Sequence, residues 1–312
     1  MPNPSMFRSS IFVICLVGGI LMQRCRSRDS LQTRIEKELS SVDGEFAVAF
    51  EDLATGEQVL INSGERFHAA STMKTPVMIE VYKQVGEGKL NLDDSILIKN
   101  RFSSIVDASP YSLDVGDDSD KEIYTQIGQK RTLYSLLYDM IIHSSNLATN
   151  LVIERVGAVN VTATMRALGA KDMEVLRGVE DKKAFEKGLN NSITAYDQLL
   201  IMKKMAQGEA VSAEASAAMM NILFDQHFRE IIPAKLPADV RVADKRGWIT
   251  GLEHDCAVVV LPDGRRYVLI LLSRKLTDRD AGVEAMANVS RIIYDHVAGR
   301  TALKDSSRTD KR

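Results

Sequence analysis

Cysteine is scarce in this chain of 312 residues, which contains three. Cys15 lies inside an apolar N-terminal stretch and Cys25 at its edge, so Cys256 alone belongs to the folded body. If the residues before Arg26 are removed, an internal disulfide is excluded. Cys256 opens the apolar run Cys256–Val260, which predicts a buried strand residue. Because no activating partner is apparent, the sequence argues against a cysteine nucleophile.

Histidine is also sparse, with five scattered residues, and no H-E-x-x-H or paired C-x-x-C occurs. The sequence therefore gives little support to a metal-dependent mechanism, and we expect no metal and no cofactor. A formal net charge of -2 gives no general reason to expect nucleic-acid binding. With 45% hydrophobic residues, the chain can bury a large core, as one large domain or two joined ones.

Residues 1–28 are predicted to be a signal peptide or a membrane anchor. Arg8 precedes an apolar run over Ile11–Met22, which is short for a bilayer span and typical of a signal sequence. The segment Gln23-Arg24-Cys25-Arg26 has no small-residue cleavage pattern, and an arginine before Cys25 argues against lipidation. Export is expected, and cleavage, lipidation and membrane association through an uncleaved anchor all stay open.

Hydrophobic periodicity places strands near both ends of the chain and helices between them. Strands are predicted at Glu45–Asp52, Gln58–Ile61, Arg241–Trp248, Cys256–Leu261 and Tyr267–Leu272. Helices are predicted at Asp29–Leu39, Ser71–Val85, Leu133–Ile142, Leu147–Val156, Val159–Leu168, Ala195–Met205, Ala213–Leu223 and Arg279–Val297.

This arrangement predicts an α+β fold: one antiparallel sheet with flanking helices built from both chain ends, plus an inserted all-α lobe. We expect the α/β lobe over about 29–68 and 235–300 and the helical lobe over about 69–234. The polar, acidic segment Ser103–Lys121 is expected to be a long loop at the mouth of the cleft between them. The charged segment Thr301–Arg312 is predicted to be a disordered tail.

The tetrad Ser71-Thr72-Met73-Lys74 at the start of an apolar helical run can make a hydroxyl nucleophilic. Residues three apart on a helix share a face, so the Lys74 amine can reach the Ser71 oxygen. The helix N-terminus adds a positive field that favours an alkoxide. Taken alone, the tetrad is better explained as a helix-capping serine followed by an exposed lysine.

Two further elements occur downstream in a characteristic order, Ser144-Ser145-Asn146 and Lys245-Arg246-Gly247. With the tetrad, they resemble the S-x-x-K, S-D-N and K-T-G motifs of class A serine β-lactamases and the related penicillin-binding proteins. The resemblance covers residues from about Leu31 to about Gly299, and it implies a β-lactamase/transpeptidase-like fold with the site between the lobes.

The resemblance implies that Ser71 attacks an amide carbonyl and becomes acylated. Its own N–H and that of Trp248 would form the oxyanion hole. Lys74 would act as the base or in a proton relay, which requires a pKa lowered by burial or by a cation such as Lys245.

By the same resemblance, Ser144 passes a proton to the leaving nitrogen and Asn146 binds the side-chain amide of the substrate. Ser145 stands where the family has aspartate. Arg246 replaces a hydroxyl residue that helps to bind the substrate carboxylate, so it either binds that carboxylate through its planar fork or blocks the pocket. Gly247 suits a close approach between backbone and ligand.

Deacylation in class A enzymes uses a glutamate followed four residues later by asparagine. Glu186 and Asn190 have that spacing, although the loop is short and no arginine precedes the glutamate. Glu180 or Asp181, after Arg177, are alternatives for the same role. A solvated Glu186 among lysines is an equally good interpretation.

The sequence thus predicts an exported, periplasmic or envelope-associated bacterial serine hydrolase, a monomer that opens β-lactams through an acyl-enzyme on Ser71. Its substrate would be a small-molecule β-lactam or a peptidoglycan-like compound. A penicillin-binding peptidase or esterase-like hydrolase with slow deacylation is the first alternative. A non-catalytic binding module at the envelope is the second.

Overall fold

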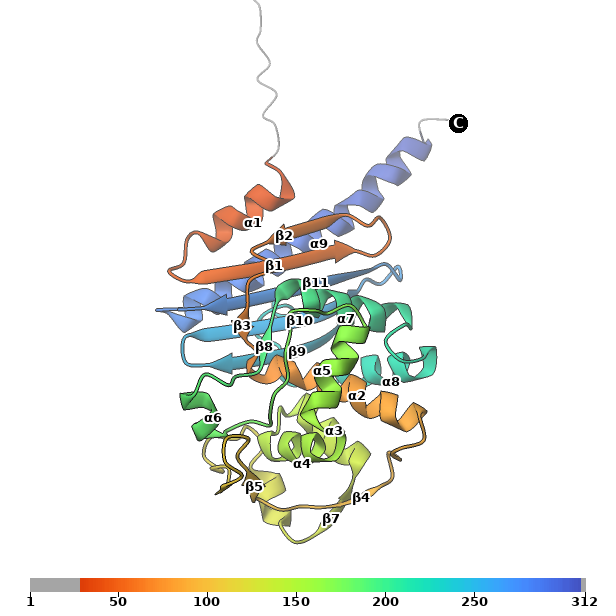
Figure 1. The fold of residues 1–312 in the computed structure, drawn as a ribbon. Coiled ribbons are helices and arrows are strands. Elements are labelled where there is room, and N and C mark those ends of the chain that lie inside the picture. Colours follow the sequence, from red (N-terminus) through yellow and green to blue (C-terminus); the bar gives the residue numbers. More distant parts are fainter. Residues whose placement is uncertain (1–28, 310–312) are drawn as a thin grey trace, which may run out of the picture.

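The computed structural model describes residues 29–309, with side-chain surroundings through residue 299. Its centre is a five-stranded antiparallel sheet in the order β2-β1-β11-β10-β9 (Figure 1). The strands are β1 (Glu45–Asp52), β2 (Gln58–Ile61), β9 (Arg241–Ile249), β10 (Leu252–Val260) and β11 (Arg266–Arg274). Because β1 pairs with β11, the two chain ends build one sheet, and the predicted fold class is confirmed.

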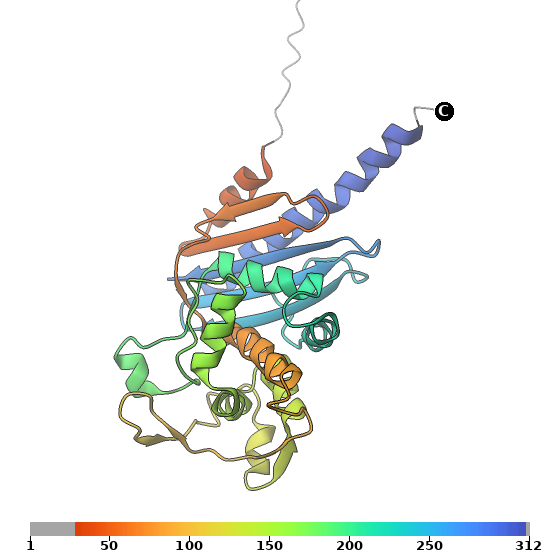
Figure 2. The same ribbon diagram turned by 45° about the vertical axis from the view of Figure 1, so that its right-hand side comes forward.

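Both faces of the sheet are covered by helices, which explains why its central strands are almost continuously apolar. The helices α1 (Leu31–Leu39) and α9 (Arg279–Thr309) lie on one face, and α7 (Ala195–Gln207) lies on the other (Figure 2). Successive side chains of a strand point to opposite faces. In β11, Leu269 therefore joins the core beneath α9, whereas Ile270 joins the core shared with the helical lobe.

The helical lobe lies along the β9 edge of the sheet (Figure 1). The buried helix α2 (Lys74–Gly86) runs through its middle, and Val77, Met78 and Val81 are fully enclosed. Serine or threonine side chains cap several helix starts, as expected for residues that accept a backbone N–H. The other helices are α3 (Leu133–Ile142), α4 (Asn146–Val156), α5 (Ala158–Ala167) and α8 (Ala213–Phe224).

The sequence analysis did not predict several short elements of the structure. A two- or three-residue strand carries no measurable hydrophobic period, so its pairing depends on tertiary context. They are η1 (Ala70–Met73), η2 (Glu122–Gln126), α6 (Lys182–Glu186), and the pairs β3 (Phe67–His68) with β8 (Ser192–Ile193), β4 (Ser95–Leu97) with β7 (Lys130–Thr132), and β5 (Phe102–Ser103) with β6 (Pro110–Tyr111).

The longer elements agree with their predicted bounds to within a few residues, and Cys256 is a buried strand residue as expected. The chain end differs: α9 continues as a helix to Thr309, where a disordered tail was predicted from Thr301. No proline or glycine interrupts residues 301–309, so the helix can extend beyond its packed turns.

The predicted signal or anchor segment lies outside the described residues. Within residues 29–309, no helix combines the length and the apolar character that crossing a membrane requires.

Candidate active site

Ser71 lies in the 3-10 turn η1, between the short strand β3 and the buried helix α2. It is half-buried, whereas Thr72 and Met73 beside it are fully buried. Ala70, just before it, has a φ of 45°, and its N–H donates to Nδ1 of His68 at 3.1 Å. A non-glycine residue in this region is strained and persists only where its surroundings hold it, so the turn presents Ser71 in a fixed position.

Strand β9 packs directly against this turn at Gly247. A Cβ atom added to Gly247 would lie 2.8 Å from the backbone N of Ser71 and 2.9 Å from that of Thr72. Any side chain here would push the strand away from the serine. The close approach expected for Gly247 is therefore an approach to the protein's own backbone, and it places Trp248 beside Ser71.

The hydroxyl of Ser144 lies between two buried lysines. Nζ of Lys74 and Nζ of Lys245 each lie 3.1 Å from Ser144 Oγ. Lys74 also donates to the Ser144 carbonyl at 2.7 Å, and Lys245 donates to the Arg246 carbonyl at 2.9 Å. Ser144 is 2% exposed and has a φ of 55°. Three of the sequence motifs thus meet at one hydroxyl group.

Burial and a neighbouring cation lower the pKa of each of the two lysines. Burial, reinforced by the charge of Lys245, holds the pKa of Lys74 well below its usual range, while Asp118 and Glu180 oppose the shift. Burial likewise lowers the pKa of Lys245 to about 7, against the opposing effects of Asp244 and Asp255. An amine with a lowered pKa can accept a proton near neutral pH, which is the property that a general base needs.

Asn146 connects Lys74 to an acidic residue. Its Oδ1 accepts from Lys74 Nζ at 3.0 Å, and its Nδ2 donates to Glu180 Oε1 at 2.8 Å. Burial raises the pKa of Glu180, and the hydrogen bonds from Asn146 and the Asp114 backbone partly offset that rise. Glu180 also has a φ of 61°, which marks a backbone held in place by its surroundings.

The loop that carries Glu180 is anchored on both sides. Oδ1 of Asn150 accepts from the Val179 N–H at 2.6 Å, and a side chain at Gly178 would overlap this same oxygen. Arg177 donates to the Leu189 carbonyl at 2.9 Å. The sequence analysis assigned no role to Asn150. Its place one helical turn after Asn146 was the available signal, because residues four apart share a helix face.

Glu186 and Asn190 lie elsewhere. Glu186 is exposed on α6, and the Asn190 side-chain oxygen accepts from Arg177 at 3.0 Å. Neither residue lines the cavity at Ser71. Asp181 caps α6 and accepts from Ser104 Oγ at 2.9 Å. Glu186 and Asn190 have the expected spacing, but Glu186 lies on a helix that faces outward. Glu180 is the acid that lies beside Asn146.

Arg246 points to the opposite face of β9 from Lys245. Its side chain is 1% exposed, and its guanidinium is ion-paired with Glu230 and Glu253. Arg279 also contacts Glu253, at 2.7 Å. With its fork occupied by two carboxylates, Arg246 neither blocks the cavity nor offers it a free cation.

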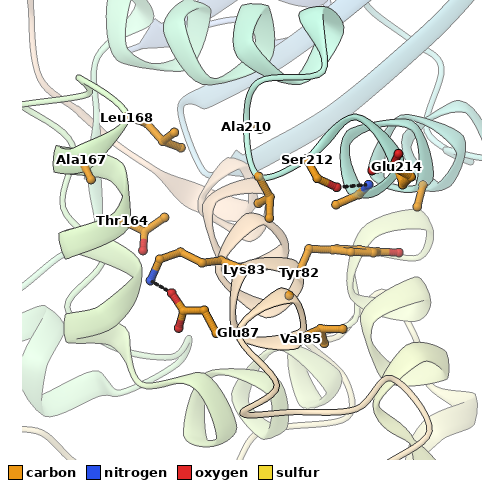
Figure 3. A pocket seen from close by; sticks show the side chains of 14 residues that line it. Tyr82, Lys83, Val85, Glu87, Thr164, Ala167, Leu168, Ala210, Ser212 and Glu214 are labelled. Atoms are coloured by element: carbon orange, nitrogen blue, oxygen red, sulfur yellow. Dashed lines mark hydrogen bonds and ion pairs between the residues drawn. The ribbon is translucent and has the colours of Figure 1, made fainter.

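A cavity of about 560 Å³ opens at Ser71. Asn146, Glu180 and Trp248 line it, and the exposed side chains of Phe185 and Ile249 contribute apolar surface. A second cavity of about 790 Å³ lies in the helical lobe among α2, α5 and α8 (Figure 3). It contains none of the residues that the sequence analysis selected. Across residues 29–309, no group of three or more His, Cys, Asp or Glu side chains is arranged to hold a metal ion.

Comparison with known proteins now decides the family. The model of the beta-lactamase enzyme family matches residues 30–297. The chain belongs to this family. It is 22% identical to beta-lactamase AER-1 of Aeromonas hydrophila, over 92% of this chain and 93% of that protein. It is 24% identical to the extended-spectrum beta-lactamase PER-1 of Pseudomonas aeruginosa, over 76% and 78% of the respective chains.

Solved structures agree with this assignment. A beta-lactamase from Sphaerobacter thermophilus superposes with a TM-score of 0.74 at 26% identity, over 86% of this chain and 97% of that one. A mutant of PBP-A, in an acyl-enzyme complex with penicillin G, superposes with a TM-score of 0.73 at 24% identity, over 86% and 96%. The predicted resemblance is confirmed, and the protein is a hydrolase of this family.

Proposed function

We propose that this protein is a class A-type β-lactamase that hydrolyses the β-lactam amide through an acyl-enzyme on Ser71. One observation carries the proposal: the Ser144 hydroxyl is held between the buried amines of Lys74 and Lys245, beside the turn that presents Ser71. An exposed lysine would be protonated at neutral pH, and a capping serine would not need two buried amines. The arrangement suits proton transfer.

In the acylation step, Ser71 Oγ attacks the β-lactam carbonyl carbon and its proton passes to Lys74. Lys74 is hydrogen-bonded to Ser144 and Asn146. Because it follows Ser71 by three residues, its amine lies on the same face as the serine, from which the proton can be taken. The backbone N–H groups of Ser71 and Trp248, brought together at Gly247, stabilise the negative oxygen that develops.

The C–N bond of the ring then breaks, and its nitrogen takes a proton from Ser144. Ser144 is resupplied by Lys74 through the 3.1 Å contact. Lys245, at the same distance on the other side, keeps this hydroxyl oriented. The proton of Ser71 thus reaches the leaving group without passing through solvent.

Deacylation requires a base for the attacking water, and we assign Glu180. It lines the cavity, it is hydrogen-bonded to Asn146, and its loop is held by Asn150 and Arg177. Water attacks the ester carbonyl carbon while Glu180 takes one of its protons. The bond between that carbon and Ser71 Oγ then breaks, and Glu180 returns the proton to Ser71 Oγ, so the serine leaves as an alcohol and the product carries the new carboxyl group. A partly buried carboxylate with a raised pKa is a stronger base than an exposed one.

The surroundings of Arg246 favour a second candidate, a penicillin-binding or esterase-like hydrolase that releases its acyl group slowly. The hydroxyl expected at this position is absent, and the guanidinium that replaces it is occupied by Glu230 and Glu253. Substrates without a carboxylate would lose less affinity from that change. A non-catalytic envelope module is disfavoured because Ser71, Lys74 and Ser144 are all present.

We also propose export to the bacterial envelope as a monomer, with a small-molecule β-lactam or a peptidoglycan-like compound as substrate. The apolar stretch Ile11–Met22 supports export, and bacterial beta-lactamases are among the relatives. The cavity of about 560 Å³ is of a size that suits small ligands.

Intact-protein mass spectrometry after mixing with benzylpenicillin tests the proposal. We expect an adduct that forms and disappears as the hydrolysed product accumulates, and no adduct on the S71A variant. An adduct that persists for hours would favour the slow-deacylation alternative. Turnover by a folded S71A variant would exclude Ser71 as the nucleophile.

A further inference from the structure

Asp118 is a buried carboxylate at the start of helix α4, contributed by the loop over Ser103–Lys121. It is 2% exposed. Its carboxylate oxygens accept from the backbone N–H groups of Asn146 at 3.0 Å and of Leu147 at 2.9 Å. Oδ2 also accepts from the Tyr124 hydroxyl at 2.9 Å, and Oδ1 from the Asp120 N–H at 3.0 Å. Four donors therefore hold this side chain in one place.

These contacts determine where Asn146 lies. The first N–H groups of a helix have no partner within the helix and favour a negative charge. The helix's own cap, Ser145, is a neutral hydroxyl that reaches the Ala148 N–H at 3.3 Å. The charge at this helix end comes instead from Asp118. Because the Asp118 carboxylate accepts a hydrogen bond from the Asn146 backbone, it fixes the orientation of the Asn146 side-chain amide, which joins Lys74 to Glu180.

The next residue of the loop holds the other side of the same site. The Ser119 hydroxyl donates to the carbonyl of His143 at 2.8 Å and to that of Ser144 at 3.2 Å. The Ser144 carbonyl also accepts a hydrogen bond from Lys74 Nζ at 2.7 Å. Two successive loop residues therefore grip the backbone on either side of Ser145.

We propose that Asp118 is a positioning residue of the active site, which fixes Asn146 between Lys74 and Glu180 and supplies negative charge to a site with two buried lysines. The proposal rests on the proposed function, because it assigns Lys74 and Asn146 their roles in acylation. Asp118 touches neither Ser71 nor the cavity, so it acts through its neighbours. Its charge favours the protonated form of Lys74, against the effects of burial and of Lys245.

The test compares D118N and D118E with wild type, and uses D120N as the matched control. D120N makes the same change of charge two residues away, on a side chain that contacts the Ile123 N–H. The rate of acylation by benzylpenicillin is measured against pH. For D118N we expect a loss of roughly 10- to 100-fold at neutral pH, because misplaced catalytic groups cost rates of that order.

The pH profile separates charge from simple structural support. Removing a negative charge near Lys74 makes its ammonium less stable, so its pKa falls and the acidic limb of the acylation profile moves to lower pH. D118E keeps the charge but displaces it by one methylene, so it should lose rate and retain the wild-type limb. If D118N does not fold, D118E alone tests the proposal. Acylation of D118E at the wild-type rate would overturn it.

A second readout needs no substrate. Titration of the lysine side-chain nitrogens by NMR, with Lys74 assigned through K74R, should give a lower midpoint for Lys74 in D118N than in wild type or D120N. If wild type is not acylated but this shift occurs, the proposed function fails and the role of Asp118 stands. If D118N shows the wild-type titration midpoint of Lys74 and the wild-type rate of acylation, the positioning role of Asp118 is refuted.

Discussion

Two neighbouring basic residues on strand β9 lie in opposite electrostatic environments. Lys245 and Arg246 are both buried, but Lys245 contacts a hydroxyl and a carbonyl, whereas Arg246 contacts the carboxylates of Glu230 and Glu253. The pKa of Lys245 falls to about 7 as a result of its burial. On the cleft face, Lys245 has neutral hydrogen-bond partners, and proton transfer becomes possible. On the opposite face, charge is paired and the strand is held in place.

The site around Lys245 is reactive, and its buried amine lowers the stability of the fold. The ion-paired cluster around Arg246 stabilises the fold and takes no part in the reaction. A buried charge without a charged partner lowers the stability of a fold, so replacing it with an apolar side chain costs little. Removing one partner of a buried ion pair lowers stability, because the other partner is then left unpaired. Changes on the two faces of β9 should therefore have opposite signatures in activity and in stability.

The largest effect is expected for K74M, which changes the α2 lysine that shares the Ser144 hydroxyl with Lys245. Removing the base should reduce the rate of acylation by a factor of about 10²–10⁴. Stability should stay level or rise, because a buried amine with a lowered pKa is replaced by an apolar side chain of similar length. Stopped-flow acylation and urea denaturation measure the two effects, and a clear loss of stability in K74M would contradict the comparison.

The next largest effect should come from E180Q, which removes the proposed base for water. Deacylation should slow by about 10²–10³, while acylation changes little, so the acyl-enzyme accumulates. Mass spectrometry after mixing with benzylpenicillin follows both steps. E186Q is the matched control, since Glu186 is exposed on α6. An adduct that accumulates in E186Q and not in E180Q would return the role to Glu186.

On the opposite face, R246M should act on stability first. It leaves the buried carboxylate of Glu253 with Arg279 as its remaining charged partner, which should cost about 3 kcal/mol of unfolding free energy. K275M is the control, because Lys275 is 72% exposed and pairs with Glu45 at the surface, where such pairs contribute about 0–1 kcal/mol. Equal losses in the two variants, measured by urea denaturation, would remove the contrast.

The smallest effect is a pH dependence that arises from Lys245. Its ammonium is lost as the pH rises through about 7, so kcat/KM for an anionic β-lactam should decline above that value if the charge attracts the substrate. In K245R the charge persists at high pH, and this decline should disappear even if the overall rate is lower. An unchanged descending limb in K245R would assign the titration to another group.

The same lysine affects stability in a defined direction. The pKa of Lys245 in the folded protein lies below the ordinary lysine value of 10.5, so the unfolded chain binds more protons between pH 7 and 10.5. Stability from this group therefore rises with pH across that window.

The order of the predicted elements and the motif residues of the site follow from local patterns. Periodicity located the strands of the sheet, and the three-residue spacing of Ser71 and Lys74 indicated a shared helix face. The choice between Glu180 and Glu186 could not be made this way, because both follow Arg177 within one loop. It depends on the path of that loop, which the contacts of Gly178 with Asn150 and of Arg177 with Leu189 determine.

Asp118 shows the same limit. Its segment was predicted to be a loop at the cleft mouth, and nothing in the local sequence marks which of its acidic residues turns inward. The Tyr124 hydroxyl and the first N–H groups of α4 make that selection, and they lie up to 29 positions away. Arg246 is similar, since its partners Glu230 and Glu253 come from other segments.

The amino-acid sequence by itself determined the fold class and the family and supplied the candidate nucleophile with its lysine, because these depend on residue type and short spacing. Only the tertiary structure decided which acid lies beside Asn146, which carboxylate accepts from the first N–H groups of α4, and which way Arg246 points. The physical reason is common to all three. The environment of a buried charge is set by donors and acceptors that meet across the fold, and long-range contacts of that kind leave no local pattern in the chain.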